Sequence, residues 1–211
     1  IAHENLYRNI SSEVETRKFL EEDMYLDDNV EKYLDYLRME ISQQLAGGEN
    51  YTTWLKVGLL FAKYEYIQHK TNYRVEDVEY IETLQEKFKD YILRNYKSLS
   101  SVSAYNSPVL LSRVLDHIFM QSSKPALIVM DGMSIEDWLI LTENLKKIKY
   151  ELTSSFAIIP TITAISRQSM LSGELPVLLK SPFNLNNEEK LFIEKCKENG
   201  YKDYEINYYR G

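Results

Sequence analysis

An acidic residue, Asp131, directly follows a short apolar run and is itself followed by Gly132. The run, residues 125–130, is rich in branched side chains, which is typical of a strand buried on both faces of a parallel sheet. Asp131 would then lie at the edge of the sheet where ligands bind, and a carboxylate there suits a hard divalent cation. Alternatively, Asp131 only caps the next helix, although Ser134, with Asp137 three residues later, is an equally good cap.

Hydroxyl side chains occupy the corresponding place after a second apolar run. Residues 154–159 predict another core strand, and Thr161 and Thr163 precede a helical run, residues 165–172, that Gly173 ends as a C-cap. At a helix N-terminus, free backbone N–H groups and the helix dipole favour an oxyanion. A Thr placed there could therefore act as an alkoxide nucleophile beside a metal. The alternative is an ordinary Thr N-cap.

The order of these features resembles the PglZ domain. The order is apolar strand, Asp-Gly, helix with a Trp, second strand, Pro-Thr-x-Thr-x-x-Ser-Arg, helix and Ser-Gly-x-x-Pro. PglZ domains are members of the alkaline phosphatase superfamily and occur in bacterial phage-defence systems of the BREX type and in some response regulators. The resemblance covers about a quarter of the chain strongly, with a weaker lead-in over residues 107–123.

The resemblance implies roles for individual residues. Asp131 matches the first metal-ligating acid, and Thr163 matches the hydroxyl nucleophile that also contacts a metal, with Thr161 as the fallback. Ser166 and Arg167 fall where related enzymes contact the phosphoryl oxygens, a task that suits the Arg fork, although Arg167 could equally face solvent. The implied activity is that of a metal-dependent phosphatase or phosphodiesterase that uses divalent metal ions, with zinc as the expected ion.

The set of possible metal ligands departs from the family pattern. A two-metal site of this superfamily needs further acids and several His ligands downstream of the nucleophile helix. All three His residues, His3, His69 and His117, precede Asp131, and no Asp-x-x-x-His or Asp-His pair follows Pro176. We therefore expect the chain to be cut short before the later ligands and to be nearly inactive by itself. The alternative function is a non-catalytic interaction or scaffold module of a defence or signalling complex.

The sequence pattern of the part of the chain before residue 120 predicts helices. Apolar residues recur with the helical period in residues 6–14, 27–46, 52–69, 76–96 and 108–119. A serine-rich stretch, residues 98–107, is the predicted linker. The expected fold class is α+α/β: a helical domain, residues 1–106, followed by the N-terminal portion of an alkaline-phosphatase-like α/β domain, residues 107–211, whose sheet begins near Ala126.

The composition indicates the cellular compartment expected for the protein. The 211 residues include one cysteine, Cys196, which excludes a disulfide framework and suits a reducing cytosol. No apolar stretch approaches the roughly 18 residues of a membrane span, and no signal peptide opens the chain. These features predict a cytoplasmic protein without membrane contact.

The charge distribution bears on the partners. The formal net charge is -7, and the excess of acids lies in residues 1–50, which argues against nucleic-acid binding by that segment. The expected partners are a phosphoester substrate of unknown identity and, from the resemblance, proteins of a defence complex. Nucleic acid would be contacted only indirectly.

Overall fold

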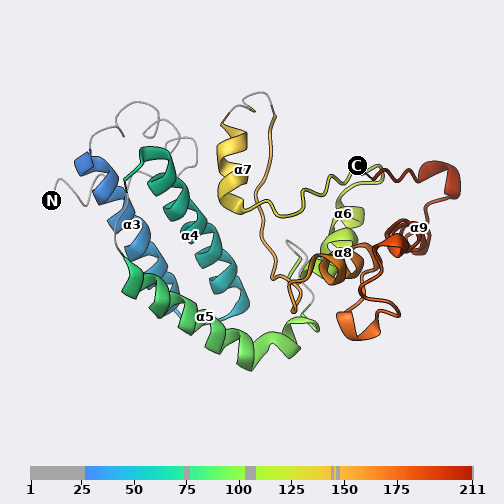
Figure 1. The fold of residues 1–211 in the computed structure, drawn as a ribbon, viewed down its shortest axis with the longest axis horizontal. Helices are drawn as coiled ribbons and strands as arrows, with labels where there is room; N and C mark the ends of the chain where they lie inside the picture. Colours follow the sequence, from blue (N-terminus) through green and yellow to red (C-terminus); the bar gives the residue numbers. More distant parts are fainter. Residues whose placement is uncertain (1–26, 74–76, 103–107, 144, 146–147, 211) are drawn as a thin grey trace. The chain divides into compact units, whose positions relative to one another are not determined.

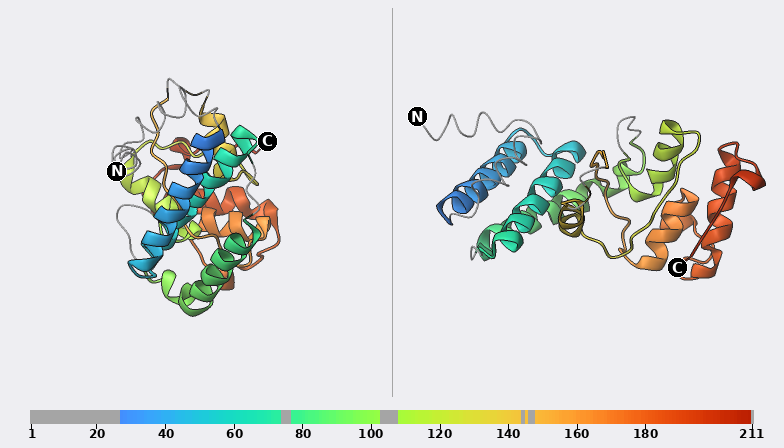
Figure 2. Two further views of the ribbon diagram at one scale, coloured as in Figure 1. Left: turned by 90° about the vertical axis from the view of Figure 1, so that its left-hand side faces the viewer. Right: turned by 90° about the horizontal axis from the view of Figure 1, so that it is seen from above.

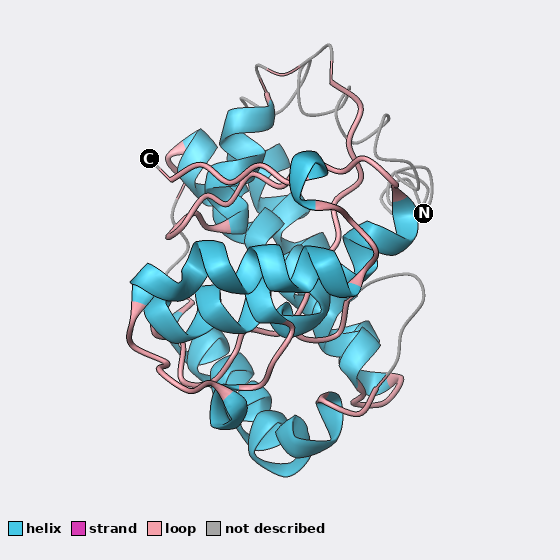
Figure 3. Cartoon of the chain, turned by 90° about the vertical axis from the view of Figure 1, so that its right-hand side faces the viewer, coloured by secondary structure: helices cyan, strands magenta, loops and turns pink. Residues whose placement is uncertain are grey.

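A computed structural model describes residues 27–73, 77–102, 108–143, 145 and 148–210. These residues form helices joined by loops, and no strand is drawn in the coloured part of the chain (Figures 1 and 3). Contacts divide the chain into a first unit, Ile1–Phe88 with Met133–Tyr150, and a second unit, Lys89–Gly132 with Glu151–Gly211. No helix of the described part is long and apolar enough to cross a membrane. The helix predicted at residues 6–14 lies outside the described residues, and the domain boundary expected at residue 106 stays a prediction.

The first unit is built from long helices. They are α3 (Asp27–Ala46), α4 (Tyr51–Thr71), the beginning of α5 (Val78–Leu99) and the shorter α7 (Ile135–Thr142). Helices α3 and α4 lie side by side in both views of Figure 2. The apolar stripe of α3 is buried against α4 in a core of Val30, Tyr33, Leu34, Leu37, Tyr64, Tyr66 and Ile67. The helices predicted over residues 27–46, 52–69 and 76–96 are confirmed.

Two carboxylates, those of Asp77 and Glu143, connect elements of the first unit that are distant in sequence. The buried hydroxyl of Tyr64 donates to Asp77, which also accepts from Arg38 at 2.6 Å. Near α7, Glu143 accepts from Tyr66 and from Lys70, the latter at 2.9 Å. Carboxylates held by such charge-assisted bonds connect α3 and α4 to the segments that follow α4 and α7.

Replacing Glu143 by Gln is expected to destabilise the first unit in a pH-dependent way. Partial burial tends to raise the pKa of Glu143, but the hydrogen bonds from Tyr66 and Lys70 outweigh it and hold the pKa below its ordinary value. Because the folded-state pKa is lowered, the stabilisation is present above the unfolded-state pKa and is lost as pH falls through the folded-state pKa. Glu143→Gln should therefore lower the free energy of unfolding more at about pH 7 than at about pH 3. Urea unfolding followed by tryptophan fluorescence measures this difference. An equal cost at both values would contradict this.

The second unit is centred on α8. Its elements after α5 are η1 (Leu111–Arg113), α6 (Val114–Gln121), α8 (Thr163–Ser172), η2 (Pro176–Leu178), η3 (Leu185–Asn187), α9 (Glu188–Glu198) and η4 (Asp203–Glu205). Helix α8 contacts both α6 and α9. Leu115 of α6 packs against Met170 and Leu171 of α8. Phe192 of α9 packs against the same cluster. This core fixes the position of α8 within its unit.

The predicted α/β sheet is wrong for the described residues. The apolar run expected as the first strand is exposed, with Ile128 at 84% and Met130 at 51%. The second run buries Phe156 and Ile158, but its only pairing in the described part is an isolated parallel bridge between Phe156 and Leu110. A strand exists only where another backbone lies alongside to exchange hydrogen bonds, and residues 125–130 form no such ladder. The expectation that Asp131 and Thr163 end two parallel strands is therefore also wrong.

Gly173 ends α8 as predicted, and replacing it by Ala is expected to destabilise the second unit by about 1–2 kcal/mol. Its φ of 77° is in the left-handed region, and an added Cβ would lie 2.8 Å from Nζ of Lys195, which forms an ion pair with Asp116 at 2.6 Å. Gly200→Ala is the matched control, because φ there is 90° but no atom lies within 4 Å of the added Cβ. Urea unfolding followed by reactivity of the buried Cys196 thiol measures both. If Gly173→Ala and Gly200→Ala lower the free energy of unfolding equally, the contact with Lys195 does not contribute to the cost of Gly173→Ala.

Candidate functional site

Thr163 is the first residue of α8. The N-cap is the apolar Ile162, whose side chain makes no capping hydrogen bond. The alternative that Thr163 is the N-cap is therefore wrong. The first backbone N–H groups of a helix have no partner within the helix, and the N-cap side chain does not supply one here. The exposed hydroxyl-bearing residues Thr161 and Thr163 thus lie at a helix end that favours negative charge.

Asp131 lies beside the same helix. Its Oδ2 is 3.7 Å from NH1 of Arg167, and its side chain is 45% exposed. Arg167 follows Thr163 by one helical turn, and residues four apart share a helix face. The Asp131 carboxylate therefore contacts a side chain that extends from the same face of α8 as Thr163.

Asp131 does not cap the helix that follows it. Ser134 is the N-cap of α7 in a complete capping box with Asp137: the Ser134 hydroxyl accepts from the Asp137 N–H at 3.0 Å, and the Asp137 carboxylate accepts from the Ser134 N–H at 2.9 Å. These hydrogen bonds, first of all the one from the backbone of Ser134, lower the pKa of Asp137. The interpretation that Asp131 caps the next helix is therefore wrong. Its carboxylate contacts the Arg167 guanidinium instead.

Arg167 forms a two-pronged ion pair with Glu188. Its Nε lies 2.7 Å from Oε1, and its NH2 donates to Oε2 at 2.8 Å. The Arg167 side chain is 25% exposed and that of Glu188 is 1% exposed, so the alternative that Arg167 faces solvent is wrong. Burial opposes the charge of Arg167, but the charge of Glu188 outweighs burial and raises the pKa of the guanidinium. The contact of NH2 with Oε2 is a charge-assisted hydrogen bond, whereas Oε1 is buried, accepts no hydrogen bond from the described residues and is paired with Nε through charge alone.

Sequence reasoning missed the partners of Arg167. Neither Glu188 nor Tyr208, whose hydroxyl donates to Oε2 of Glu188 at 3.2 Å, was among the predicted site residues. One signal was present: Glu188 shares its helical stripe with Leu191, Phe192 and the buried Cys196. A charged residue inside an apolar stripe is expected to have a buried partner.

Ser166 lies in the first turn of α8, where its backbone N–H donates to the Ile162 carbonyl at 2.9 Å. Its side chain is partly buried. Ser166 is therefore near the N-terminal end of α8, three residues after Thr163. The expected contact of Ser166 with phosphoryl oxygens stays a prediction.

The described residues do not form a metal centre. No group of three or more His, Cys, Asp or Glu side chains in the described ranges is arranged to hold a metal ion. Asp131 faces the cationic Arg167, while His117 contacts Gln121 at 3.0 Å and His69 lies 3.6 Å from Glu136. The assignment of zinc to Asp131 and Thr163 therefore stays a prediction from the family resemblance.

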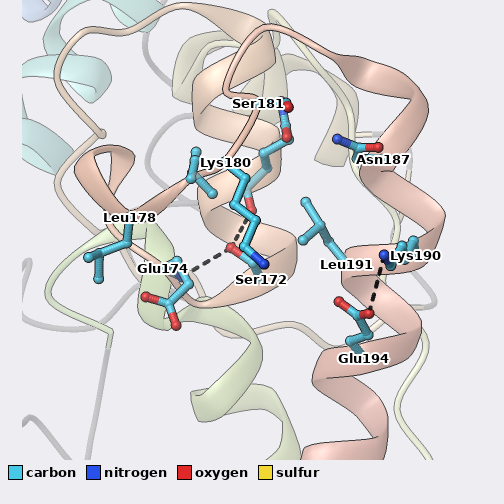
Figure 4. A pocket seen from close by; sticks show the side chains of 11 residues that line it. Ser172, Glu174, Leu178, Lys180, Ser181, Asn187, Lys190, Leu191 and Glu194 are labelled. Carbon is cyan, nitrogen blue, oxygen red and sulfur yellow. Dashed lines mark hydrogen bonds and ion pairs between the residues drawn. The ribbon is translucent and has the colours of Figure 1, made fainter.

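A separate cavity of about 590 Å³ lies between α8, the loop that follows it, and α9 (Figure 4). Its lining mixes both charges, with Lys180 and Lys190 against Glu174 and Glu194. Lys190 and Glu194 form an ion pair at 3.8 Å across one helical turn of α9. The predicted site residues are absent from this lining, so the cavity is distinct from the site at the start of α8.

Comparison with known proteins bears on the same part of the chain. Residues 110–208 match the family model for PglZ, the BREX system PglZ alkaline phosphatase-like domain. No curated protein and no solved structure matches the chain. The matched segment is just under half of the chain and includes Asp131, Thr163, Arg167, Glu188 and Tyr208. The match that the order of the sequence motifs predicted is thus confirmed: residues 110–208 are similar to the PglZ domain family.

Proposed function

We propose that residues 110–208 carry the nucleophile side of a phosphoester-hydrolase site of the PglZ type. The observation that supports the proposal is the contact of Asp131 with a side chain on the Thr163 face of α8, with its carboxylate 3.7 Å from the Arg167 guanidinium. An acid, a hydroxyl, a guanidinium and a helix N-terminus within one short region are the groups that phosphoryl transfer needs.

In the proposed reaction, Thr163 attacks the phosphorus atom. The Oγ1–H proton passes to water as a bond forms between Oγ1 and phosphorus, while the bond from phosphorus to the leaving oxygen breaks and that oxygen takes a proton from water. A further water then hydrolyses the phosphothreonine, which returns a proton to Oγ1 and releases the phosphoryl group as phosphate. The N–H groups at the start of α8, together with Arg167 and Ser166, would stabilise the negative phosphoryl oxygens. Asp131 is the proposed metal-binding acid, and we assign no step to a metal ion because the described residues form no metal centre.

Hydrolysis of p-nitrophenyl phosphate and bis(p-nitrophenyl) phosphate, with zinc or manganese added, tests the nucleophile. We expect slow turnover by the chain, because affinity for a divalent ion depends on the number and charge of its ligands. Thr163→Ala should lower the remaining rate by about 100-fold or more. Thr161→Ala is the matched control and should change the rate by less than about twofold, because Thr161 precedes α8 and does not share the helix face of Arg167.

Two results would contradict parts of this proposal. Metal-dependent turnover that survives Thr163→Ala, or that is lost with Thr161→Ala, would remove Thr163 as the nucleophile. Fast turnover that Thr163→Ala abolishes would keep the nucleophile but show that the expected shortage of metal ligands is wrong.

A second candidate function is a non-catalytic interaction or scaffold module of a defence complex. It is favoured by exposed apolar side chains in and after η2, with Val177 at 85%, Leu178 at 61% and Phe183 at 69%. Val177 and Leu178 are adjacent in the chain, and neighbouring exposed apolar side chains are typical of protein contacts. A phage-protection assay with the complete system separates the functions. Loss of protection with Thr163→Ala supports catalysis, whereas loss only with Val177→Asp and Phe183→Asp supports docking.

A further inference from the structure

We propose that Glu188 is a positioning residue for Arg167 and that Tyr208 supports it, so that one edge of the guanidinium stays presented to a phosphoryl group at the start of α8. This inference rests on the proposed function, because it names the residues that would orient Arg167 within that site.

The geometry divides the guanidinium of Arg167 into two edges. Its inner edge, Nε with NH2, faces the carboxylate of Glu188: NH2 donates to Oε2 at 2.8 Å, while Nε lies 2.7 Å from Oε1 in an ion-pair contact without hydrogen-bond geometry. A guanidinium carries five N–H donors in a rigid plane, so fixing one edge also fixes the direction of the other. The remaining nitrogen, NH1, lies 3.7 Å from Oδ2 of Asp131, on the side away from Glu188. The outer edge is therefore the part of Arg167 that can meet a phosphoryl oxygen.

Glu188 is itself held firmly. Its side chain is 1% exposed, it begins α9, and its Oε2 also accepts from the Tyr208 hydroxyl at 3.2 Å. The Tyr208 ring packs against Phe192 of α9, with ring centroids 5.9 Å apart. A buried carboxylate whose Oε2 accepts two hydrogen bonds, and whose Oε1 lies against Nε of Arg167, has little freedom to move, and a guanidinium paired with it loses little further freedom on binding an anion.

The competing interpretation is that Glu188 only joins α9 to α8. The second unit offers a matched comparison: Lys195 of α9 forms an ion pair with Asp116 of α6 at 2.6 Å, with side-chain exposures of 12% and 31%. This pair also joins two helices of the unit but involves none of the site residues. A purely structural role predicts that breaking either pair has the same kind of effect.

The test is the binding of inorganic phosphate to the whole chain, measured by calorimetry and by the nitrogen-15 NMR signal of the Arg167 Nε–H group. We expect Glu188→Gln to weaken phosphate binding about tenfold and to broaden or shift the Nε–H signal, because a neutral amide lacks the charge that pairs with the guanidinium. Tyr208→Phe should weaken binding about two- to threefold. Asp116→Asn should lower stability yet change phosphate affinity by less than about twofold. Glu188→Asp, which keeps the charge, should recover part of the loss.

The outcomes separate this inference from the proposed function. Phosphate binding that is lost with Arg167→Gln, but is no weaker with Glu188→Gln than with Asp116→Asn, would overturn the positioning role and leave the proposed function standing. Phosphate binding unaffected by Arg167→Gln would remove Arg167 from the site and overturn both. If Glu188→Gln does not fold, Tyr208→Phe decides: unchanged affinity with an unchanged Nε–H signal would overturn the proposal.

Discussion

Replacement of Arg167 by Met is expected to lower the free energy of unfolding of the second unit by about 3–5 kcal/mol. The variant leaves the Glu188 carboxylate, 1% exposed, without the guanidinium that donates to its Oε2 and whose charge compensates for its removal from water. The remaining donor, the Tyr208 hydroxyl at 3.2 Å, is neutral and cannot replace a cation. Removing one partner of a buried ion pair costs far more than the net contribution of the pair.

The double variant Arg167→Met with Glu188→Leu is expected to recover most of this loss, because it removes the buried charge together with its partner. The buried Cys196, the single cysteine of the chain, lies on α9, so its reaction with a thiol reagent in urea reports unfolding of the second unit.

The matched control is Lys197→Met. Lys197 pairs with Asp203 at 2.6 Å, but the two side chains are 48% and 78% exposed. Exposed pairs contribute less than about 1 kcal/mol. Equal losses in Arg167→Met and Lys197→Met, or no recovery in the double variant, would show that Glu188 is not held as a buried charge.

The helices of the first unit could be predicted from the sequence because their signals are local. The stripe from Val30 to Ile41 in α3 repeats with the helical period and is buried as expected. The ends are also encoded locally: α3 ends at Ala46, just before Gly47, and Asn50 caps α4 by accepting from the Thr53 N–H at 3.0 Å. Such patterns depend on neighbours three or four residues away, so no knowledge of the tertiary structure is needed.

The sheet could not be predicted in the same way. Apolar, branched residues in 125–130 indicate a preference for burial in a strand, but they do not specify the second backbone that a strand requires. In the described residues that backbone is present only for Phe156, opposite Leu110. The segment 125–130 therefore carries a strand-like composition without strand pairing.

The candidate site was predicted in part. The residue types and order placed Asp131, Thr163 and Arg167 in one site, and the structure brings Asp131 to Arg167 and places Thr163 one turn before Arg167 on the same helix. Glu188 could not be assigned to the site, because an acid in the first turn of a helix is ordinarily explained by the helix dipole. Its burial against Arg167 depends on how α9 packs on α8, which no local pattern contains.

Leu34→Ala is expected to lower the free energy of unfolding of the first unit by about 2–5 kcal/mol. Leu34 is 0% exposed and belongs to the core between α3 and α4. Truncation removes buried methyl groups and leaves a cavity that the surrounding tyrosine rings can fill only partly, so both the transfer and the cavity costs apply. Met39, on the same helix and 44% exposed, provides the control, because Met39→Ala removes a side chain that water already reaches.

Tryptophan fluorescence in urea measures this prediction selectively, since both tryptophans of the chain, Trp54 and Trp138, lie in the first unit. Leu34→Ala should shift the fluorescence transition to lower urea, while the Cys196 reaction, which reports the second unit, should change much less. Met39→Ala should change either transition by less than about 1 kcal/mol. If Leu34→Ala and Met39→Ala shift the fluorescence transition equally, the packing of α3 on α4 is not the core of the first unit. If Leu34→Ala shifts both probes together, the two units unfold as one cooperative system and their stabilities are coupled.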